Sequence, residues 1–307
     1  MKQFRSFVAL GLAAALLSGC MREVSSVRED SAKRVAMPVF MVSRNVPSGP
    51  FMLQAYERVY KKYAPATIYI EGDGRSYLSY ERVNADPTPL DPIALRLAAQ
   101  DGSPNVIYLA RPGQYNIGWA HGKRVPAEYW TTKRFSSEVV DAYGAALDNI
   151  KAYHNVPSFR LVGYDGGAAI ATILASQRND ILSLQTVAGN LDPQTMVTTH
   201  NIHPLDGSLN PVDFAPKIAT LPQRHFIGKL DKIVPSSVYN SFAQSAGDGR
   251  CMNVTLVDNA DHELGWAEQW KVLKDMPLDC SGPAQPVPVP FDPTPLDGDK
   301  YKTKSAK

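Results

Sequence analysis

Three side chains in this sequence have the types and the order that nucleophilic catalysis requires: Asp165, Asp231 and His262. Each of them follows a short apolar run that is expected to be a strand. His262 can act as general base, because a histidine titrates near neutral pH. Asp231 can hold the tautomer of that histidine and stabilise its charged form. Asp165 would then be the attacking group.

Asp165 is the middle residue of Gly-Tyr-Asp-Gly-Gly at 163–167, between an apolar run and a helical pattern. This is the context of the G-x-S-x-G nucleophile elbow, a tight strand-to-helix turn that exposes one side chain above a sheet. A carboxylate stands here where that motif has a serine hydroxyl. Taken singly, Asp165 could cap a helix, Asp231 could form a turn and His262 could be a surface loop residue. Their common placement at strand ends favours the catalytic interpretation.

A second part of the site is predicted directly after the run 66–71, in Gly72-Asp73-Gly74. Backbone N–H groups of this loop, together with the N–H of Gly166, would form an oxyanion hole. Asp73 raises an electrostatic objection, because two carboxylates in one site push one pKa up and a protonated Asp165 attacks poorly. The objection weakens if Asp73 points to solvent.

The elements that must position these residues alternate along the chain. Apolar runs predict strands buried on both faces, at 66–71, 105–110, 159–163, 183–188, 224–228 and 253–257. Helical patterns cover 136–153, 168–177 and 235–246, with Ser136 as an N-terminal cap. This alternation predicts an α/β fold with a mostly parallel sheet covered by helices on both faces. The loop-rich segment 191–219 is expected to form a small cap over the site.

These segments together resemble the α/β-hydrolase superfamily over roughly residues 50–275, where the order of nucleophile, acid and histidine is the same. More narrowly, the chain resembles bacterial envelope α/β-hydrolase lipoproteins. The stretches that carry this resemblance are 68–74, 91–114, 129–136, 161–168, 186–192, 223–235 and 260–266. It implies the hydrolase fold, with Asp165 as nucleophile, Asp231 as acid and His262 as base. The chain departs from the group at Asp165, where members usually carry serine.

An aspartate at this position changes the expected reaction. A carboxylate attacks saturated carbon better than acyl carbon and gives an alkyl ester, which water activated by a histidine then cleaves. Haloalkane dehalogenases and epoxide hydrolases use Asp–acid–His in this way. The sequence thus predicts a hydrolase of ester-like or alkyl small molecules that needs no cofactor. One alternative is a serine-hydrolase descendant with little turnover that acts as a binding lipoprotein, and another is a purely structural envelope lipoprotein.

The N-terminus predicts a lipid anchor. Lys2 and Arg5 precede an apolar run at 7–17, and Leu17-Ser18-Gly19-Cys20 matches a bacterial lipobox. Removal of residues 1–19 and acylation of Cys20 would hold the protein in the cell envelope. Because Met21 follows Cys20, we expect the periplasmic side of the outer membrane in a Gram-negative host. The alternative is an ordinary signal peptide with a chance cysteine.

The remaining organisation follows from composition. Residues 20–50 are expected to be a tether, 51–280 the hydrolase domain, and 281–307 an extended Pro-rich basic tail. The net charge of +2 gives no reason to expect nucleic acid as a partner. No spacing of the other histidines predicts a metal site. Cys251 and Cys280 could form a disulfide in an oxidising envelope, but the sequence gives no distance between them.

Overall fold

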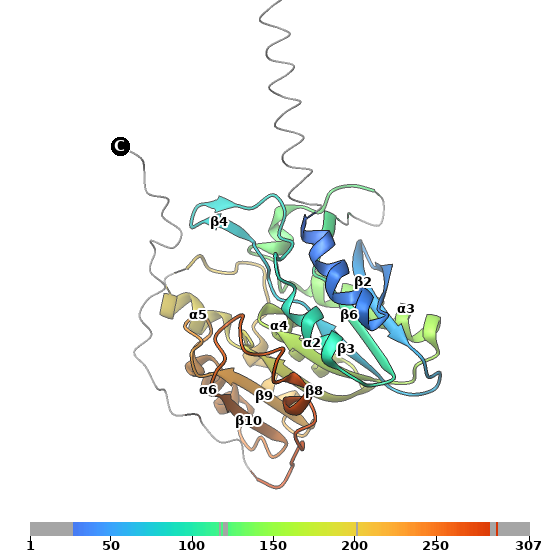
Figure 1. The fold of residues 1–307 in the computed structure, drawn as a ribbon. Coiled ribbons are helices and arrows are strands. Elements are labelled where there is room, and N and C mark those ends of the chain that lie inside the picture. Colours follow the sequence, from blue (N-terminus) through green and yellow to red (C-terminus); the bar gives the residue numbers. More distant parts are fainter. Residues whose placement is uncertain (1–26, 117, 119–121, 201, 283–286, 288–307) are drawn as a thin grey trace, which may run out of the picture.

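The structure is a computed structural model, and it describes residues 27–116, 118, 122–200, 202–282 and 287 (Figure 1). Its centre is an eight-stranded sheet with the spatial order β1-β2-β6-β3-β7-β8-β9-β10. Strands β6, β3, β7, β8, β9 and β10 are parallel, whereas β1 and β2 are antiparallel at one edge. The strands of this sheet are β1 (Val42–Ser48), β2 (Phe51–Val59), β3 (Ala66–Ile70), β6 (Asn105–Leu109), β7 (Phe159–Tyr164), β8 (Ile181–Val187), β9 (Gln223–Gly228) and β10 (Met252–Val257). The six predicted strands are therefore confirmed as the parallel part of the sheet.

Helices cover both faces of this sheet, as predicted. One apolar core lies beneath α3 (Ser137–His154), α4 (Gly166–Gln177) and α6 (Ser236–Ala246). The other face packs against α2 (Ile93–Gln100), α7 (Trp270–Leu273) and a helix at 27–36. Alternate strand residues enter the two cores, because successive side chains of a strand point to opposite faces.

A side-chain contact explains where α3 begins, whereas α4 begins without one. The predicted cap Ser136 accepts a hydrogen bond from the Val139 N–H at 3.4 Å, which satisfies one free donor of α3. Asp165 precedes α4, but its side chain makes no capping hydrogen bond. The structure thus gives no support to the interpretation of Asp165 as a helix cap. That leaves its carboxylate available to the site.

The fold begins earlier in the chain than the predicted boundary at residue 51. Residues expected to be a tether form the helix at 27–36, the short 3-10 helix η1 (Met37–Val39) and the edge strand β1. The prediction was wrong here because β1 is polar and half exposed, so its sequence carries no apolar run. Cys20, the expected signal segment 1–19 and most of the tail 281–307 lie outside the described residues.

The segment 191–219 is only partly a cap. It contains α5 (Pro193–His200) and the 3-10 helix η4 (Pro211–Ile218), and η4 packs against α4 and α6 as part of a helical layer. The stretch between these two helices packs against the segments that contain Phe135 and Tyr80. The Leu209 N–H donates to the Phe135 carbonyl at 3.0 Å, and His203 stacks on Tyr80 with ring centroids 4.1 Å apart. Tyr80 belongs to a hairpin of β4 (Tyr77–Ser79) and β5 (Arg82–Val83) that follows the predicted oxyanion loop. The remaining 3-10 helices are η2 (Gln114–Asn116) and η3 (Ala127–Trp130).

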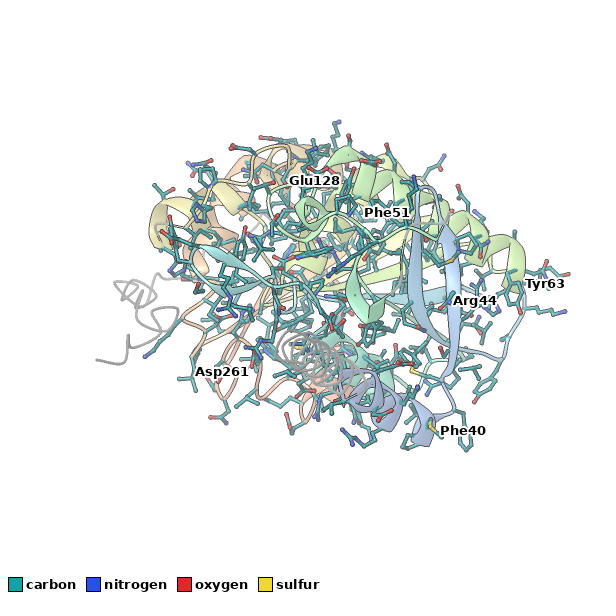
Figure 2. The ribbon with its side chains drawn as sticks, turned by 90° about the horizontal axis from the view of Figure 1, so that it is seen from above. Phe40, Arg44, Phe51, Tyr63, Glu128 and Asp261 are labelled. Carbon is teal, nitrogen blue, oxygen red and sulfur yellow. A yellow bond between two sulfur atoms is a disulfide. The ribbon has the colours of Figure 1, made fainter. Side chains whose placement is uncertain are left out.

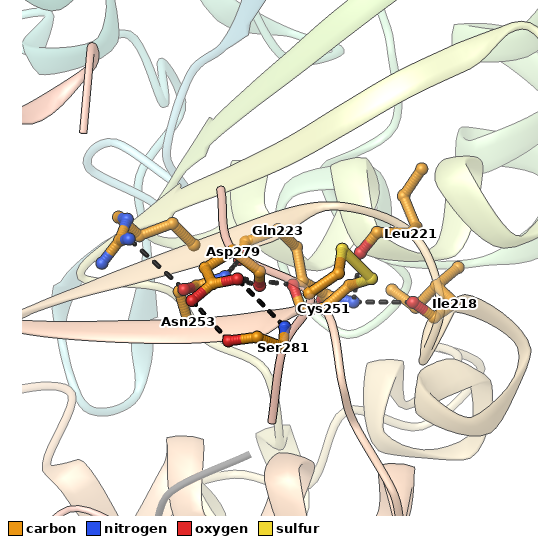
Figure 3. The surroundings of a disulfide bond; sticks show 9 residues. Ile218, Leu221, Gln223, Cys251, Asn253, Asp279 and Ser281 are labelled. Carbon is orange, nitrogen blue, oxygen red and sulfur yellow. Dashed lines mark hydrogen bonds between the residues drawn. A yellow bond between two sulfur atoms is a disulfide. The ribbon is translucent and has the colours of Figure 1, made fainter. Parts of the chain in front are cut away.

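A disulfide joins Cys251, just before β10, to Cys280 at the end of the described chain (Figure 3). Their Cα atoms are 3.9 Å apart. Asn253 donates from its amide to the carbonyls of Asp279, Gln223 and Cys251, and so holds the same two segments together. Among the described residues, no helix is long and apolar enough to cross a membrane.

Candidate active site

The predicted nucleophile lies on a strained turn between β7 and α4. Asp165 has φ 49° and ψ −121°, a conformation that costs a residue with a side chain about 1–3 kcal/mol. The backbone packs closely around this turn because Gly163 has no side chain. A Cβ on Gly163 would lie 2.4 Å from the Ala168 Cα. Strain at a single residue facing other titratable groups is typical of a functional position.

The structure brings the three predicted catalytic residues together at the carboxyl edge of the sheet. His262 Nδ1 is 3.1 Å from Asp231 Oδ2, and His262 Nε2 is 3.8 Å from Asp165 Oδ1. The histidine ring therefore stands between the two carboxylates. The side chains of Asp165 and His262 are 16% and 12% exposed, and that of Asp231 is fully buried.

Hydrogen bonds hold both Asp231 and His262 in place. Asp231 Oδ1 accepts hydrogen bonds from the N–H groups of Ile233 and Val234 at 2.8 and 2.9 Å, which leaves Oδ2 for the histidine. The His262 carbonyl accepts from Tyr164 Oη at 3.0 Å and from the Trp266 indole N–H at 3.1 Å. Asp231 thus forms the turn with one oxygen and contacts the histidine ring with the other, so the turn does not exclude the predicted orienting role.

The predicted oxyanion loop supplies one N–H to the nucleophile itself. The Asp73 N–H donates to Asp165 Oδ2 at 3.0 Å, and the N–H of Gly166 also favours the ionised form of Asp165. The Gly72 N–H donates elsewhere, to Glu71 Oε1 at 2.9 Å, while Gly74 turns the chain with φ 63°. Of the three loop residues, Asp73 therefore supplies the donor.

The side chain of Asp73 does not point to solvent. The electrostatic objection from the sequence, that its carboxylate would raise the pKa of Asp165, therefore stands. The carboxylate lies over Gly166, where an added Cβ would meet Asp73 Oδ1 at 2.0 Å. Two arginines bind it: Arg111 Nη1 is 2.9 Å from Oδ1 and Arg134 Nη1 is 3.0 Å from Oδ2. The charge of Asp73 is therefore offset by two guanidinium groups that are themselves largely buried.

Neither Arg111 nor Arg134 was identified from the sequence. Each lies in a loop far along the chain from Asp73, and no local spacing connects them to it. Arg111 follows the β6 strand, however, and a charged residue directly after a buried strand is a signal that could have indicated the site edge. Arg134 carries no such signal.

The electrostatics of the site follow from these contacts. Burial opposes the charge of His262, but its hydrogen bond to Asp231 and the charges of Asp231 and Asp165 outweigh burial and raise its pKa to about 9. Burial and the charge of Asp73 raise the pKa of Asp165, while His262 and the N–H groups of Asp73 and Gly166 act in the opposite direction. The two groups are thus poised to share a proton or to form an ion pair.

A further carboxyl group lies beneath the oxyanion loop. Glu71 is 1% exposed, and its Oε1 accepts from the N–H groups of Gly72 and Ala94 at 2.9 and 3.3 Å. Burial raises its pKa to about 7, with these N–H groups acting against burial. Glu71 closes the predicted strand 66–71, but its supporting role was not identified from the sequence. Over the described residues, no group of His, Cys, Asp and Glu could hold a metal ion.

The fold of this chain is similar to that of several solved structures, although its sequence matches no known family. No protein-family model matches the sequence, and no curated protein sequence matches it. An esterase of Pyrococcus furiosus superposes with a TM-score of 0.55, at 13% identity, over 78% of this chain and 92% of that chain. Proline iminopeptidase of Mycobacterium smegmatis gives 0.53 at 12% identity, over 76% of this chain and 94% of that chain. A bacterial membrane phospholipase A gives 0.51 at 14% identity, over 89% and 94%.

At such low identity these similarities describe the fold and leave the reaction open. This chain has the mostly parallel sheet with helices on both faces that an α/β fold requires. The chain therefore has the α/β-hydrolase fold.

Proposed function

We propose that this protein is a hydrolase that uses Asp165 as a covalent nucleophile on ester-like or alkyl small molecules. One observation carries the proposal: the two oxygens of Asp165 have different partners. Oδ2 accepts the Asp73 N–H, and Oδ1 faces His262 Nε2, behind which Asp231 lies at hydrogen-bond distance. One oxygen is thus held in the oxyanion hole while the other faces the general base.

The first step uses the free oxygen. Asp165 Oδ1 attacks a saturated carbon of the substrate, the bond from that carbon to the leaving group breaks, and the leaving group departs with the electron pair. The product is an alkyl ester of Asp165. Both partners of the carboxylate favour its ionised form, which is the form that attacks.

The second step returns the enzyme to its starting state. His262 Nε2 takes a proton from water, and the resulting hydroxide attacks the carboxyl carbon of Asp165. The negative charge develops on Oδ2, which accepts the Asp73 N–H, and the N–H of Gly166 also favours negative charge on this group. Collapse expels the alcohol, which takes its proton from His262, while Asp231 stabilises the imidazolium between these events.

Arg111 and Arg134 support the first step because they offset the negative charge of Asp73 beside Asp165. The carboxylate of Asp73 beside Asp165 would favour protonation of the nucleophile, but both of its oxygens are bound by guanidinium groups. The two arginines also hold Asp73 in place and thereby aim its N–H at Asp165. They are positioning residues, because they act through Asp73.

A second function is favoured by two features of Asp165: it stands where the G-x-S-x-G elbow has serine, and its pKa is raised by burial and by the charge of Asp73. On this alternative, the chain is a serine-hydrolase descendant with little turnover that binds small molecules in the envelope. The raised pKa favours the protonated nucleophile, whereas the close histidine favours the ionised one. Measurement of a covalent intermediate separates the two functions.

The decisive experiment is a single turnover in heavy-oxygen water with excess protein. The probes are short-chain p-nitrophenyl esters, 1-bromoalkanes and terminal epoxides. Covalent catalysis places the label in the Asp165 carboxylate, which mass spectrometry of the Gly163–Gly167 peptide detects. His262→Ala should stop the second step, so the alkyl adduct accumulates on Asp165. Product formation with neither label nor adduct would remove the covalent mechanism.

A companion variant tests the alternative. If Asp165→Ser hydrolyses the p-nitrophenyl esters and the parent chain acts on none of the probes, the chain is a disabled serine hydrolase. If Asp165→Asn abolishes a measured parent activity, the binding function fails. The Asp165→Asn change keeps the side-chain shape, removes the charge and replaces one acceptor oxygen by an NH2 donor.

We further propose that the protein is anchored through acylated Cys20 to the bacterial envelope, on the periplasmic side of the outer membrane. The support is the lipobox Leu17-Ser18-Gly19-Cys20 after a short apolar run. Labelled palmitate should enter the parent chain and not Cys20→Ser, and the parent should fractionate with outer membranes. Incorporation of label into Cys20→Ser would contradict the assignment of the modified residue.

A further inference from the structure

The β4–β5 hairpin exposes apolar side chains at the same edge of the molecule as the candidate active site. The exposed apolar residues of the hairpin, together with one from each of the two segments that the Arg28–Asp86 ion pair joins at its base, are here called the hairpin patch. They are between 39% and 55% exposed. They are Val27, Leu78, Tyr80, Val83 and Leu90. Neighbouring apolar side chains on a surface commonly mark an interaction site, whereas single ones do not.

The hairpin is a direct continuation of the oxyanion loop. Ser76 Oγ donates to the Asp73 carbonyl at 3.0 Å, and the Asn84 N–H donates to the Ser76 carbonyl at 2.9 Å. The Trp130 indole N–H also holds Asn84, through its carbonyl at 3.1 Å. The stem of the hairpin is therefore fixed next to Asp73, while its tip is exposed. Whatever the tip contacts lies beside the site.

The N-terminal end of the described chain is fastened to the base of this hairpin. Arg28 is 5% exposed, and its Nη1 donates to the Asp86 carbonyl at 2.8 Å and lies 3.2 Å from the Asp86 carboxylate. Cys20 precedes Val27 by seven positions, a length that spans at most about 24 Å. A lipid on Cys20 therefore keeps this edge of the protein close to the membrane.

The charges on the hairpin side of the patch complement an anionic lipid surface. Arg75, Arg82, Lys123 and Arg124 are exposed there, and Glu81 is the exposed acidic residue of the hairpin. Beside Val27, Glu29 and Asp30 are exposed as well, so the cations are in excess only on the hairpin side. Arg124 belongs to this edge, because its guanidinium donates to the Ala85 carbonyl. Basic side chains near an anionic membrane surface favour binding to it.

We propose that the hairpin patch lies on the lipid surface that anchors the protein, so that the candidate active site opens toward the membrane. This inference rests on the anchoring at Cys20 proposed above. It names a substrate class for the site: amphipathic molecules that partition into the membrane interface and present their reacting carbon at headgroup depth. Apolar side chains inserted among headgroups, with cations around them, are typical of interfacial binding.

A second exposed apolar region provides the rival orientation. Phe40 and Tyr63 are 76% and 81% exposed, and Figure 2 shows both on the right-hand side of the molecule. Tyr63 follows the end of β2, and β2 runs antiparallel to β6, with Val59 opposite Asn105 at the start of β6. Tyr63 therefore lies toward the amino edge of the parallel strands, whereas the site lies at their carboxyl edge. The two regions cannot both lie flat on one membrane.

Tryptophan quenching by brominated lipids distinguishes the two orientations. The full lipidated chain is reconstituted on vesicles of phosphatidylethanolamine and phosphatidylglycerol, with or without bromine on the acyl chains. Leu78→Trp and Val83→Trp report on the hairpin, and Phe40→Trp and Tyr63→Trp are matched controls at exposed apolar positions. The parent chain gives the background of the four native tryptophans.

We expect the added emission in Leu78→Trp and Val83→Trp to fall about twofold on brominated vesicles, and that of the controls to stay constant. Quenching in Phe40→Trp or Tyr63→Trp without quenching in the hairpin overturns the proposal. Sedimentation with vesicles but no quenching at any position also overturns it, while leaving the anchor intact. If the parent chain does not sediment with vesicles at all, the anchor itself is wrong and the docking falls with it.

Discussion

The carboxylate of Asp73 lies between two guanidinium groups and directly over Gly166, beside the carboxylate of Asp165. Burial is the largest cause of the raised pKa of Asp165, and the charge of Asp73 is the second largest. Arg111 is 3% exposed, so its charge depends on Asp73 for a partner within the protein. The same carboxylate thus opposes ionisation of the nucleophile and stabilises the loop that supports it.

Asp73→Asn separates these two effects. Loss of the carboxylate leaves buried guanidinium groups without their counter-charge and should lower the free energy of unfolding by about 3 kcal/mol. It should also lower the pKa of Asp165, because a like charge is removed while two cations remain. Urea denaturation gives the first quantity, and ¹³C NMR of labelled aspartate carboxyl groups gives the second.

The matched control is Asp258→Asn, which removes an aspartate that is 73% exposed and paired with Lys229 at the surface. That change should alter the free energy of unfolding by no more than about 0.5 kcal/mol. An unchanged pKa of Asp165 in Asp73→Asn would show that the two carboxylates do not interact.

Protonation of His262 has a consequence for stability as well as for catalysis. Its pKa is raised from the ordinary value of 6.5 to about 9, so the folded chain binds this proton more tightly than the unfolded chain. This contribution to the free energy of unfolding is fully present below about pH 6.5 and is lost as the pH rises through about 9. In the proposed second step the neutral ring is the base, and Asp165 is then an uncharged ester that no longer raises the pKa of His262. Hydrolysis of the ester should therefore quicken as the pH rises, with a midpoint below about 9.

Asp231→Asn tests the cause of the raised pKa. Without the carboxylate, burial becomes the dominant influence, and the pKa of His262 should fall below about 6.5. Titration of the imidazole by NMR measures it. Asp261→Asn is the control, because the Asp261 side chain accepts from the Glu263 and Leu264 N–H groups and makes no bond to the histidine ring. Equal titration of both variants contradicts the assignment of Asp231.

The sequence was sufficient to predict which three side chains converge, since each stands after a strand of one parallel sheet. It was not sufficient for the groups that set their charge. Arg134 reaches Asp73 from a loop whose path depends on packing against Phe135 and the segment near Ser208. Such contacts depend on tertiary structure, and no local pattern encodes them.

The β7–α4 turn depends on the absence of a side chain at Gly163. A Cβ there would lie 2.4 Å from the Ala168 Cα and 2.5 Å from the Gly167 carbonyl oxygen, both of which are backbone atoms. Backbone cannot yield as the end of a flexible side chain can. The strand and the helix would have to separate, and the elbow that presents Asp165 would open.

Gly163→Ala should therefore reduce the free energy of unfolding by at least about 3 kcal/mol, in the range of severe core changes. Gly144→Ala is the matched control in the middle of α3, where an added Cβ meets nothing within 4 Å. That change should instead stabilise the protein by about 0.5–1 kcal/mol, because alanine loses less backbone freedom in a helix. Thermal and urea unfolding measure both. A tolerated Gly163→Ala would mean that the elbow is looser than these distances imply.

Some strands could be predicted from the local sequence pattern, whereas others depend on tertiary packing. Each of the six parallel strands contains an apolar run that is visible in the sequence, and β3 and β6 are buried at every position, whereas β10 is only half-buried along its middle. The antiparallel edge is different: β2 contains Gln54 and Glu57, which are buried because Ser43, Arg44 and His154 bind them. A strand whose polar residues are satisfied by its neighbours cannot be recognised from hydrophobicity alone.

The carboxyl and amino edges of the parallel strands carry different features of the molecule. The carboxyl edge carries Asp165, Asp231 and His262, and the amino edge near β10 carries the disulfide. Cys251 precedes β10, whereas His262 follows its far end, so the strand separates them. Stability and chemistry should therefore respond independently when the disulfide is removed.

The double variant Cys251→Ser, Cys280→Ser tests this separation. The disulfide closes a loop of 29 positions, and its loss should lower the free energy of unfolding by about 3 kcal/mol by increasing the freedom of the unfolded chain. The pKa of His262 should remain near 9, since no bond of the disulfide reaches the site edge. Urea denaturation and NMR titration of the same sample measure both. The parent chain treated with a reductant should reproduce the variant, and a coincident loss of the His262 titration would show that the two edges are coupled.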